Sequence, residues 1–168
     1  MSLSLLVLAL VTAQRLGELA LARRNTRRLL AAGGREVGAG HYPLIVLLHG
    51  AWLAGLWVLA WNRPAVVGWL VVYAGLQALR VWVIASLAGR WTTRIVVVPG
   101  SPLVRRGPYR LLPHPNYLVV AGEIAVLPLA FGLPVYAAVF SVLNAAMMWV
   151  RIRAESRALK QTAAGARP

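Results

Sequence analysis

Residues 43–62 read PLIVLLHGAWLAGLWVLAWN, and residues 65–88 read AVVGWLVVYAGLQALRVWVIASLA. Each run contains about the 20 predominantly apolar residues that an α-helix needs to cross the hydrocarbon layer of a bilayer. Three further apolar runs lie at residues 3–22, 117–132 and 134–150. The sequence therefore predicts an all-α integral membrane protein with about five transmembrane helices.

The last two apolar runs are short, and Phe131-Gly132-Leu133-Pro134 separates them. This combination is a helix stop followed by a restart, which predicts a tight helical hairpin. A single kinked helix is the alternative. No composition shift divides the chain, so residues 1–168 are expected to form a single membrane domain.

The composition agrees with a membrane location and narrows the possible chemistry. The chain is 60% hydrophobic and 13% charged, with a mean hydropathy of +0.67, more apolar surface than a soluble core of this size could bury. The absence of cysteine excludes disulfide scaffolds, thiol nucleophiles and iron–sulfur clusters. The three histidines are too scattered to predict a metal site. The only acids are Glu18, Glu36, Glu123 and Glu155, so each is a candidate functional group.

The net charge of +14 follows the predicted topology. The basic residues gather in the first and third connections and in the tail after residue 150, whereas the second connection has only Arg63. By the positive-inside rule, the N-terminus is predicted outside, and the long connection at 89–116 and the tail at 151–168 are predicted in the cytoplasm. Since topology accounts for the basic residues, nucleic-acid binding is not predicted.

Polar residues within the apolar runs are predicted to lie at the middle or in the cytoplasmic half of the membrane. They are Gln14, Arg15, Glu18, His49, Gln77, Arg80, Glu123 and Asn144. Ionisable groups in a bilayer are costly unless they pair or face a wet cavity. The pattern predicts either a site at the cytoplasmic leaflet or structural ion pairs, Arg15 with Glu18 and Arg80 with Glu123. The outer half has Trp57, Trp61, Trp69 and Tyr136 as a predicted interfacial belt.

The longest connection, residues 89–116, ends in a motif. It contains RRGPYR at 105–110 and runs into the next helix through HPNY at 114–117, while TTRIVVV at 92–98 could be extended. Pro115 fits the first turn of that helix, and amides that begin a helix attract anions. Alone, the motif is also typical of a solvated helix start.

The run GPYRLLPHPNY at 107–117, the hairpin and RIRAES at 151–156 together resemble the isoprenylcysteine carboxyl methyltransferase family. That family usually has G-x-Y-x-x-x-R-H-P-x-Y followed by R-I-x-x-E-E. The segments EVGAGHYPLIVLLHGAWLAG at 36–55 and NYLVVAGEI at 116–124 look like a bacterial branch that makes alkylpyrone or alkylresorcinol methyl ethers. Pro113 stands where the family has arginine and Ser156 where it has a second glutamate, which weakens a prenylcysteine assignment more than methyl transfer.

The resemblance implies a membrane methyltransferase that uses S-adenosylmethionine and accepts a lipid from the bilayer. It implies a cytosolic cofactor pocket formed by the 89–116 connection and the tail. Matched by motif, the implied cofactor-binding residues are Gly107, Tyr109, His114, Pro115, Asn116, Tyr117, Arg151 and Glu155.

Methyl transfer from a sulfonium needs alignment, a dry approach and an ionised acceptor oxygen, and it requires no metal. A carboxylate or an acidic hydroxypyrone is already an anion, which Arg80, Arg110 or Arg153 could hold. A resorcinol hydroxyl would need a base, for which His114 and Glu123 are the candidates. Ion pairing with Arg80 is the alternative role for Glu123.

Other readings remain open at the level of sequence. The acceptor could be a prenylcysteine carboxylate, and a membrane reductase of sterols or enones is a second enzyme class. A small membrane carrier, which is not an enzyme, is a further alternative. Transporters usually show internal repeats, however, and none is visible in this sequence. The expected partners are a lipophilic acceptor and membrane lipids, and a homo-oligomer is compatible with the sequence.

Overall fold

The computed structural model describes residues 2–101 and 104–164, with side chains described as far as Glu155. Five α-helices make up most of it: α1 (Leu3–Ala31), α2 (Tyr42–Ala60), α3 (Val67–Leu87), α4 (Pro115–Ala130) and α5 (Pro134–Ala164). Short 3₁₀ turns occur at η1 (Ala39–His41), η2 (Ala88–Arg90) and η3 (Gly107–Arg110). Two short strands, β1 (Arg35–Val37) and β2 (Ile95–Val97), pair antiparallel.

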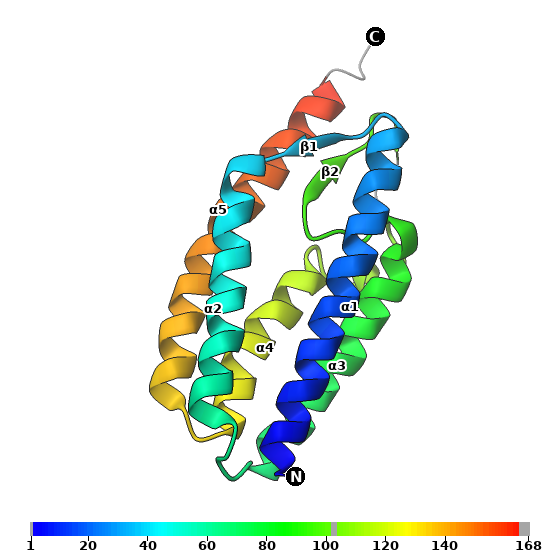
Figure 1. Cartoon of the computed structure of the whole chain (residues 1–168). Coiled ribbons are helices and arrows are strands. Elements are labelled where there is room, and N and C mark those ends of the chain that lie inside the picture. The colour runs from blue at the N-terminus through cyan, green and yellow to red at the C-terminus, as the bar shows by residue number, and fades with distance from the viewer. Residues whose placement is uncertain (1, 102–103, 165–168) are drawn as a thin grey trace.

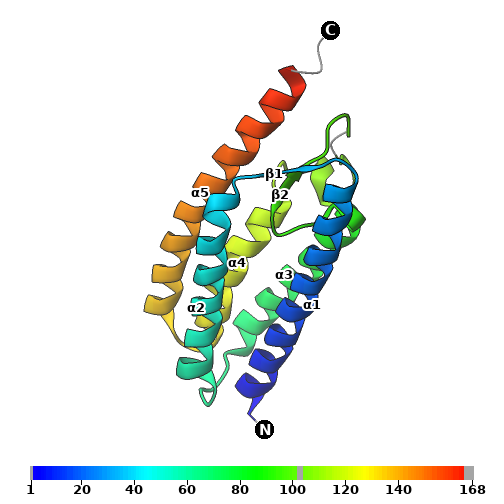
Figure 2. The same cartoon turned by 45° about the horizontal axis from the view of Figure 1, so that its top comes forward.

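The helices form an elongated bundle in which α1 begins at one end and α5 ends at the other (Figures 1 and 2). Four helical segments are long and apolar enough to cross a membrane: Leu3–Ala31, Ala39–Ala60, Val67–Arg90 and Pro134–Glu155. The α4 helix has 16 residues and begins nearer the middle of the molecule than the ribbon of strands does (Figure 1). The chain is therefore a helical integral membrane protein.

The hairpin between α4 and α5 forms as predicted, and the kinked-helix alternative is wrong. Gly132 adopts a left-handed conformation (φ 65°), which a glycine tolerates and which ends α4. The Leu133 amide donates to the Pro128 carbonyl oxygen at 3.0 Å, which closes the turn. Pro134 then begins α5, so α5 returns alongside α4.

Two helices run further than the hydropathy pattern predicts. The first apolar run ends at residue 22 and the last at residue 150, but α1 continues to Ala31 and α5 to Ala164. Neither extension contains glycine or proline, and the first left-handed residue after α1 is Gly33 (φ 83°). The arginines at 23, 24, 27 and 28 and those at 151, 153 and 157 therefore lie on helices that extend beyond the apolar runs, whereas Arg35 lies in β1.

The strands join the first and third connections into a ribbon. Arg35 pairs with Val97 and Val37 with Ile95, and Arg94 Nη1 lies 2.8 Å from a Glu36 carboxylate oxygen. The structure confirms an extended segment within residues 92–98, whereas β1 was not predicted. The ribbon spans the end of the bundle where α1 ends and α2 begins (Figure 1).

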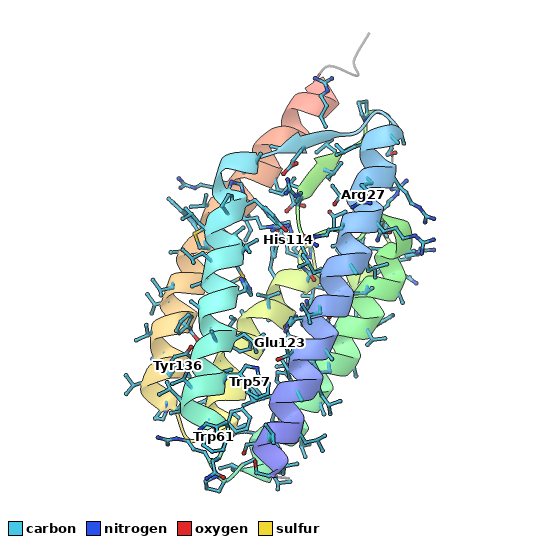
Figure 3. All side chains as sticks on the ribbon, viewed as in Figure 1. Arg27, Trp57, Trp61, His114, Glu123 and Tyr136 are labelled. Atoms are coloured by element: carbon cyan, nitrogen blue, oxygen red, sulfur yellow. The ribbon has the colours of Figure 1, made fainter. Side chains whose placement is uncertain are left out.

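Two apolar clusters form the core, one on each side of a polar layer. One, containing Leu8, Trp52, Leu56 and Phe131, lies toward the end where α1 begins. The other contains Ala22, Val83, Trp91 and Val119. Figure 3 shows Trp57, Trp61 and Tyr136 toward one end of the molecule and Arg27 toward the other, with Glu123 and His114 between them.

Candidate active site

A buried ionic cluster joins three helices between the two apolar clusters. Arg80 of α3 binds both carboxylate oxygens of Glu18 on α1 at 2.5 Å, and its Nη1 lies 2.9 Å from Glu123 Oε2 on α4. Arg15 of α1 reaches the same Glu123 oxygen at 2.8 Å and Glu18 Oε2 at 3.1 Å. Gln77 donates to Glu123 Oε1 at 2.7 Å, so both oxygens of this carboxylate have partners.

This arrangement favours the ion-pair interpretation of Arg80 and Glu123. Only 1% of Glu123 is exposed, and the guanidinium of Arg80 is divided between two carboxylates. Two glutamates and two arginines cancel in formal charge, which is what allows ionised groups to remain in an apolar interior. The two predicted pairs form, but as one network rather than separately.

Beside this cluster lies a cavity of about 300 Å³. It is bounded by α1, α2, α4 and α5, by Arg80 of α3 and by residues 91–93. Its polar lining includes Arg15, His49, Asn116, Tyr117, Asn144 and Arg151, and its apolar lining includes Leu16, Val46, Leu53, Ile124, Met147 and Met148. Leu16 of α1 is 63% exposed in the surface of the chain and Val46 of α2 is half exposed, so the cavity reaches the lipid-facing surface between these helices.

A second hollow, of about 510 Å³, is more open and lies at the end of α3, lined by residues 87–90 and 104–106. None of the residues implied to bind cofactor lines it, so its larger size does not make it the better candidate. Within residues 2–101 and 104–164, no group of three or more His, Cys, Asp or Glu side chains could hold a metal ion.

Three of the residues implied by the motif contact the side chain of a fourth, Tyr117, in the first turn of α4. The Tyr117 hydroxyl donates to Glu155 Oε2 at 2.5 Å and accepts from Arg151 Nε at 3.0 Å. The ring of His114 stacks on the Tyr117 ring with centroids 5.2 Å apart. We call these residues, His114, Tyr117, Arg151 and Glu155, the Tyr117 cluster.

The hairpin explains why residues 34 and 38 positions apart meet in this cluster. Because α5 runs antiparallel to α4 and continues without a break, its extension passes the start of α4 (Figure 2). Arg151 and Glu155 are four residues apart and therefore share one helix face. Arg151 Nη1 also donates to the Thr93 carbonyl oxygen at 2.7 Å, which fixes the third connection against α5.

The remaining motif residues shape the loop around this cluster. Pro115 is buried in the first turn of α4, and Asn116 Oδ1 accepts from Trp91 Nε1 at 3.5 Å at the cavity wall. Tyr109 packs against the apolar cluster that contains Trp91. Burial, with a smaller contribution from the Glu155 carboxylate, raises the pKa of Tyr109 to about 12, so it remains a neutral phenol at physiological pH.

Two predicted anion-holding residues lie apart from the described cavity wall. Arg110 is exposed at the end of η3, and Arg153 is exposed with its guanidinium 3.7 Å from the centroid of the Trp149 ring. In the part of the chain that the structure describes, neither lines the cavity beside the ionic cluster. The third, Arg80, does line the cavity although its guanidinium pairs with Glu18 and Glu123, and so does Arg15, which was predicted only as an ion-pair partner.

Sequence reasoning missed several groups of this site. His49 and Asn144 were included among the polar residues at this depth but were given no catalytic or cofactor-binding role, although both line the cavity. The depth of these two residues within the membrane was the sequence feature that indicated a role, since polar groups within a bilayer usually face a partner or a cavity. Thr93 contributes a backbone carbonyl, for which a sequence carries no side-chain signal.

Comparison with known proteins identifies the family. The model of the isoprenylcysteine carboxyl methyltransferase family matches residues 67–161. The chain belongs to this family. It is also 40% identical over 161 residues to "Uncharacterized protein YpbQ" of Bacillus subtilis (strain 168), covering 93% of the chain and 96% of that relative. No solved structure matches.

Membership in the isoprenylcysteine carboxyl methyltransferase family makes this chain a membrane methyltransferase. The matched region begins at α3 and takes in the long connection, α4 and most of α5, and therefore the whole Tyr117 cluster. Arg15 and His49 lie before it, on α1 and α2. The cavity is thus built partly from the matched region and partly from the two helices that precede it.

Gly107 of this methyltransferase occupies a position that excludes other residues. It has φ 57°, and a Cβ there would lie 2.1 Å from Ser86 Oγ. We expect Gly107→Ala to lower the free energy of unfolding by about 1–3 kcal/mol, because strain and overlap add. Thermal unfolding in detergent measures this. Gly89→Ala is the matched control, since nothing lies within 4 Å of a Cβ added there. An equal loss of stability in both variants would contradict the conclusion that residue 107 must be glycine.

Proposed function

We propose that this methyltransferase transfers a methyl group from S-adenosylmethionine to an oxygen of a lipophilic acceptor at the cytoplasmic leaflet. The acceptor class that we favour is an alkylpyrone or alkylresorcinol lipid. The observation that supports this best is the cavity of about 300 Å³, which has Tyr117 and Arg151 in one part of its wall and exposed apolar side chains of α1 and α2 in another. Such a cavity suits a polar donor and an apolar acceptor together.

The Tyr117 cluster has the chemistry that S-adenosylmethionine requires. The Arg151 guanidinium suits the amino-acid carboxylate, and the Glu155 carboxylate suits the ribose hydroxyls. The stacked rings of His114 and Tyr117 offer faces for the adenine. When bound, S-adenosylmethionine supplies an electrophilic methyl group. The protein's own residues bind and orient the reactants and exclude water, since this transfer depends chiefly on alignment.

The apolar lining supports a lipid acceptor that enters from the side. Leu16 and Val46 contact both the cavity and the surface that faces acyl chains, so an alkyl chain could remain in the bilayer while its head enters. The positive-inside rule supports an orientation with the N-terminus outside and the Tyr117 cluster at the cytoplasmic face. Bacterial inner membrane is the location that we propose.

A prenylcysteine carboxylate is the second candidate, and the family match favours it. It would use the same alignment of donor and acceptor, but its carboxylate is already ionised at neutral pH and needs no base. The two candidates therefore differ in the head group that must fit between α1, α2 and α5. An assay with both head groups separates them.

The proposal predicts methylated lipid products from the purified protein in lipid nanodiscs. We would supply S-adenosylmethionine with a labelled methyl group and, in parallel, a 5-alkylresorcinol, a 6-alkyl-4-hydroxy-2-pyrone and an S-farnesylcysteine derivative. Mass spectrometry is expected to find the label on an oxygen of the resorcinol or pyrone. Label only on the farnesylcysteine carboxyl would select the second candidate. Binding of lipid without any methyl transfer would contradict the proposal and favour the small membrane carrier instead.

A further inference from the structure

Besides Glu18, Arg80 and Glu123 of the ionic cluster, three polar side chains line the cavity from three different helices at one depth. They are Arg15 of α1, His49 of α2 and Asn144 of α5. Arg15 lies about three helical turns after the start of α1, His49 about three turns before the end of α2, and Asn144 about three turns after the start of α5. Apolar side chains, including Leu53, Met147 and Met148, complete this part of the wall. A small group of polar atoms in an otherwise apolar cavity is typical of a site that orients a ligand.

The hydrogen bond of His49 determines which ring nitrogen is free. Its Nδ1 lies 2.9 Å from the carbonyl oxygen of Ile45, one turn earlier on α2. A carbonyl oxygen can only accept, so Nδ1 of the neutral ring carries the proton. Nε2 then keeps its lone pair and can accept a hydrogen bond or a proton in the cavity.

Asn144 has unused hydrogen-bonding capacity at the same depth. The residue is 2% exposed, and within the described residues its side-chain amide has no hydrogen-bond partner in the protein. Among the described residues the fully buried side-chain atom without a partner is the Tyr73 hydroxyl and not the Asn144 amide, so this amide is accessible from the cavity. A ligand in the cavity that supplies a hydroxyl or carbonyl group can therefore form a hydrogen bond with the Asn144 amide.

Arg15 supplies positive charge on the same wall. Its side chain is 22% exposed, compared with 7% for Arg80, and it lines the cavity while its other contacts are to Glu18 and Glu123. Arg15 is therefore the more accessible of the two cluster arginines. A guanidinium near an acceptor oxygen stabilises negative charge as it develops.

We propose that His49 is the catalytic base for an acceptor that carries an un-ionised aromatic or enolic hydroxyl, with Asn144 and Arg15 holding that oxygen. This inference rests on the proposed function and specifies its substrate class. As the oxygen–methyl bond forms, the hydroxyl proton passes to Nε2 of His49. The bond between the methyl carbon and the sulfonium sulfur breaks, and its electron pair remains on sulfur. The imidazolium then returns the proton to water.

The other base candidates are less well placed for this step. Both oxygens of Glu123 are occupied by Arg15, Arg80 and Gln77. His114 stacks on Tyr117 and is not among the described residues that line the cavity. His49 combines a free ring nitrogen with a place on the cavity wall.

The first test compares two acceptors in His49→Asn, which can keep the hydrogen bond to Ile45 but has no base. With a 5-alkylresorcinol, we expect kcat to fall at least 100-fold, within the range that general-base catalysis contributes. With a nitro-substituted analogue that is already a phenolate at the assay pH, we expect less than a threefold change. His41→Asn is the matched control, because His41 lies in η1 before α2 and does not line the described cavity.

The second test needs no methyl donor. Nitrogen NMR of the protein with labelled histidine distinguishes protonated from unprotonated ring nitrogens, and His49→Asn assigns the His49 signals. We expect the signal of the unprotonated nitrogen to move when the 5-alkylresorcinol is added alone. An unmoved signal, or equal kcat on the resorcinol in His49→Asn and the natural protein, would overturn the role of His49. Absence of methylation by the natural protein would instead overturn the proposed function.

Discussion

Replacement of Glu123 by glutamine is expected to lower the free energy of unfolding by about 3–5 kcal/mol. The side chain keeps its size, so the loss would come from charge rather than from a cavity. Glu123 is the shared partner of Arg15 and Arg80, and the substitution leaves two guanidinium groups facing the single carboxylate of Glu18. An uncompensated positive charge in an apolar interior is what makes a broken buried pair costly.

The charge explanation can be separated from loss of a hydrogen bond with a double variant. Arg15→Gln together with Glu123→Gln restores formal neutrality, so we expect it to be more stable than Glu123→Gln alone. Unfolding in detergent, followed by tryptophan fluorescence against increasing sodium dodecyl sulfate, measures both. A Glu123→Gln protein that unfolds like the natural one, or a double variant less stable than the single, would contradict the interpretation.

The helices could be predicted because the signal for them is local. About twenty apolar residues in a row have few alternatives to a membrane helix, and Gly132 followed by Pro134 marks the turn of the hairpin. The helix ends could not be predicted in the same way. Hydropathy indicates where the apolar surface stops, whereas both α1 and α5 continue well beyond the apolar runs, and α1 ends just before the left-handed Gly33.

The polar layer shows a second limit of sequence reasoning. Depth along each helix placed Arg15, His49, Arg80 and Glu123 near one level, and the structure brings three of them into the ionic cluster. Depth gives no rotation about the helix axis, however, so it could not show that His49 lines the cavity outside the ionic cluster, whereas Arg15 and Arg80 line it while paired with glutamates. The three-residue strands of the ribbon are too short for alternation to reveal both of them.

The four glutamates divide into groups with different physical roles. Glu18 and Glu123 neutralise arginines within the bundle, and Glu36 pairs with Arg94 on the half-exposed ribbon. Glu155 lies on α5, outside the ionic cluster, and its carboxylate accepts a hydrogen bond from the Tyr117 hydroxyl. Because the chain has no other acid, Glu155 is the carboxylate that the Tyr117 cluster can offer to a ligand.

Replacement of Glu155 by glutamine is expected to weaken S-adenosylmethionine binding about 10- to 100-fold with little effect on folding. A hydrogen bond to a charged group contributes about 1.5–3 kcal/mol, and the amide lacks the charge while keeping the size. The side chain is only half-buried, so the free energy of unfolding should change by about 0.5 kcal/mol or less.

Calorimetry of S-adenosylmethionine binding to the purified protein in nanodiscs measures the loss, and Glu36→Gln is the matched control. Both variants remove one carboxylate from the same end of the molecule, but Glu36 faces Arg94 in the ribbon and not the Tyr117 cluster. A loss of affinity that is equal in the two variants would show a general effect of charge on an already basic protein. A loss confined to Glu155→Gln requires a specific contact, and unchanged affinity in that variant would remove Glu155 from the donor site.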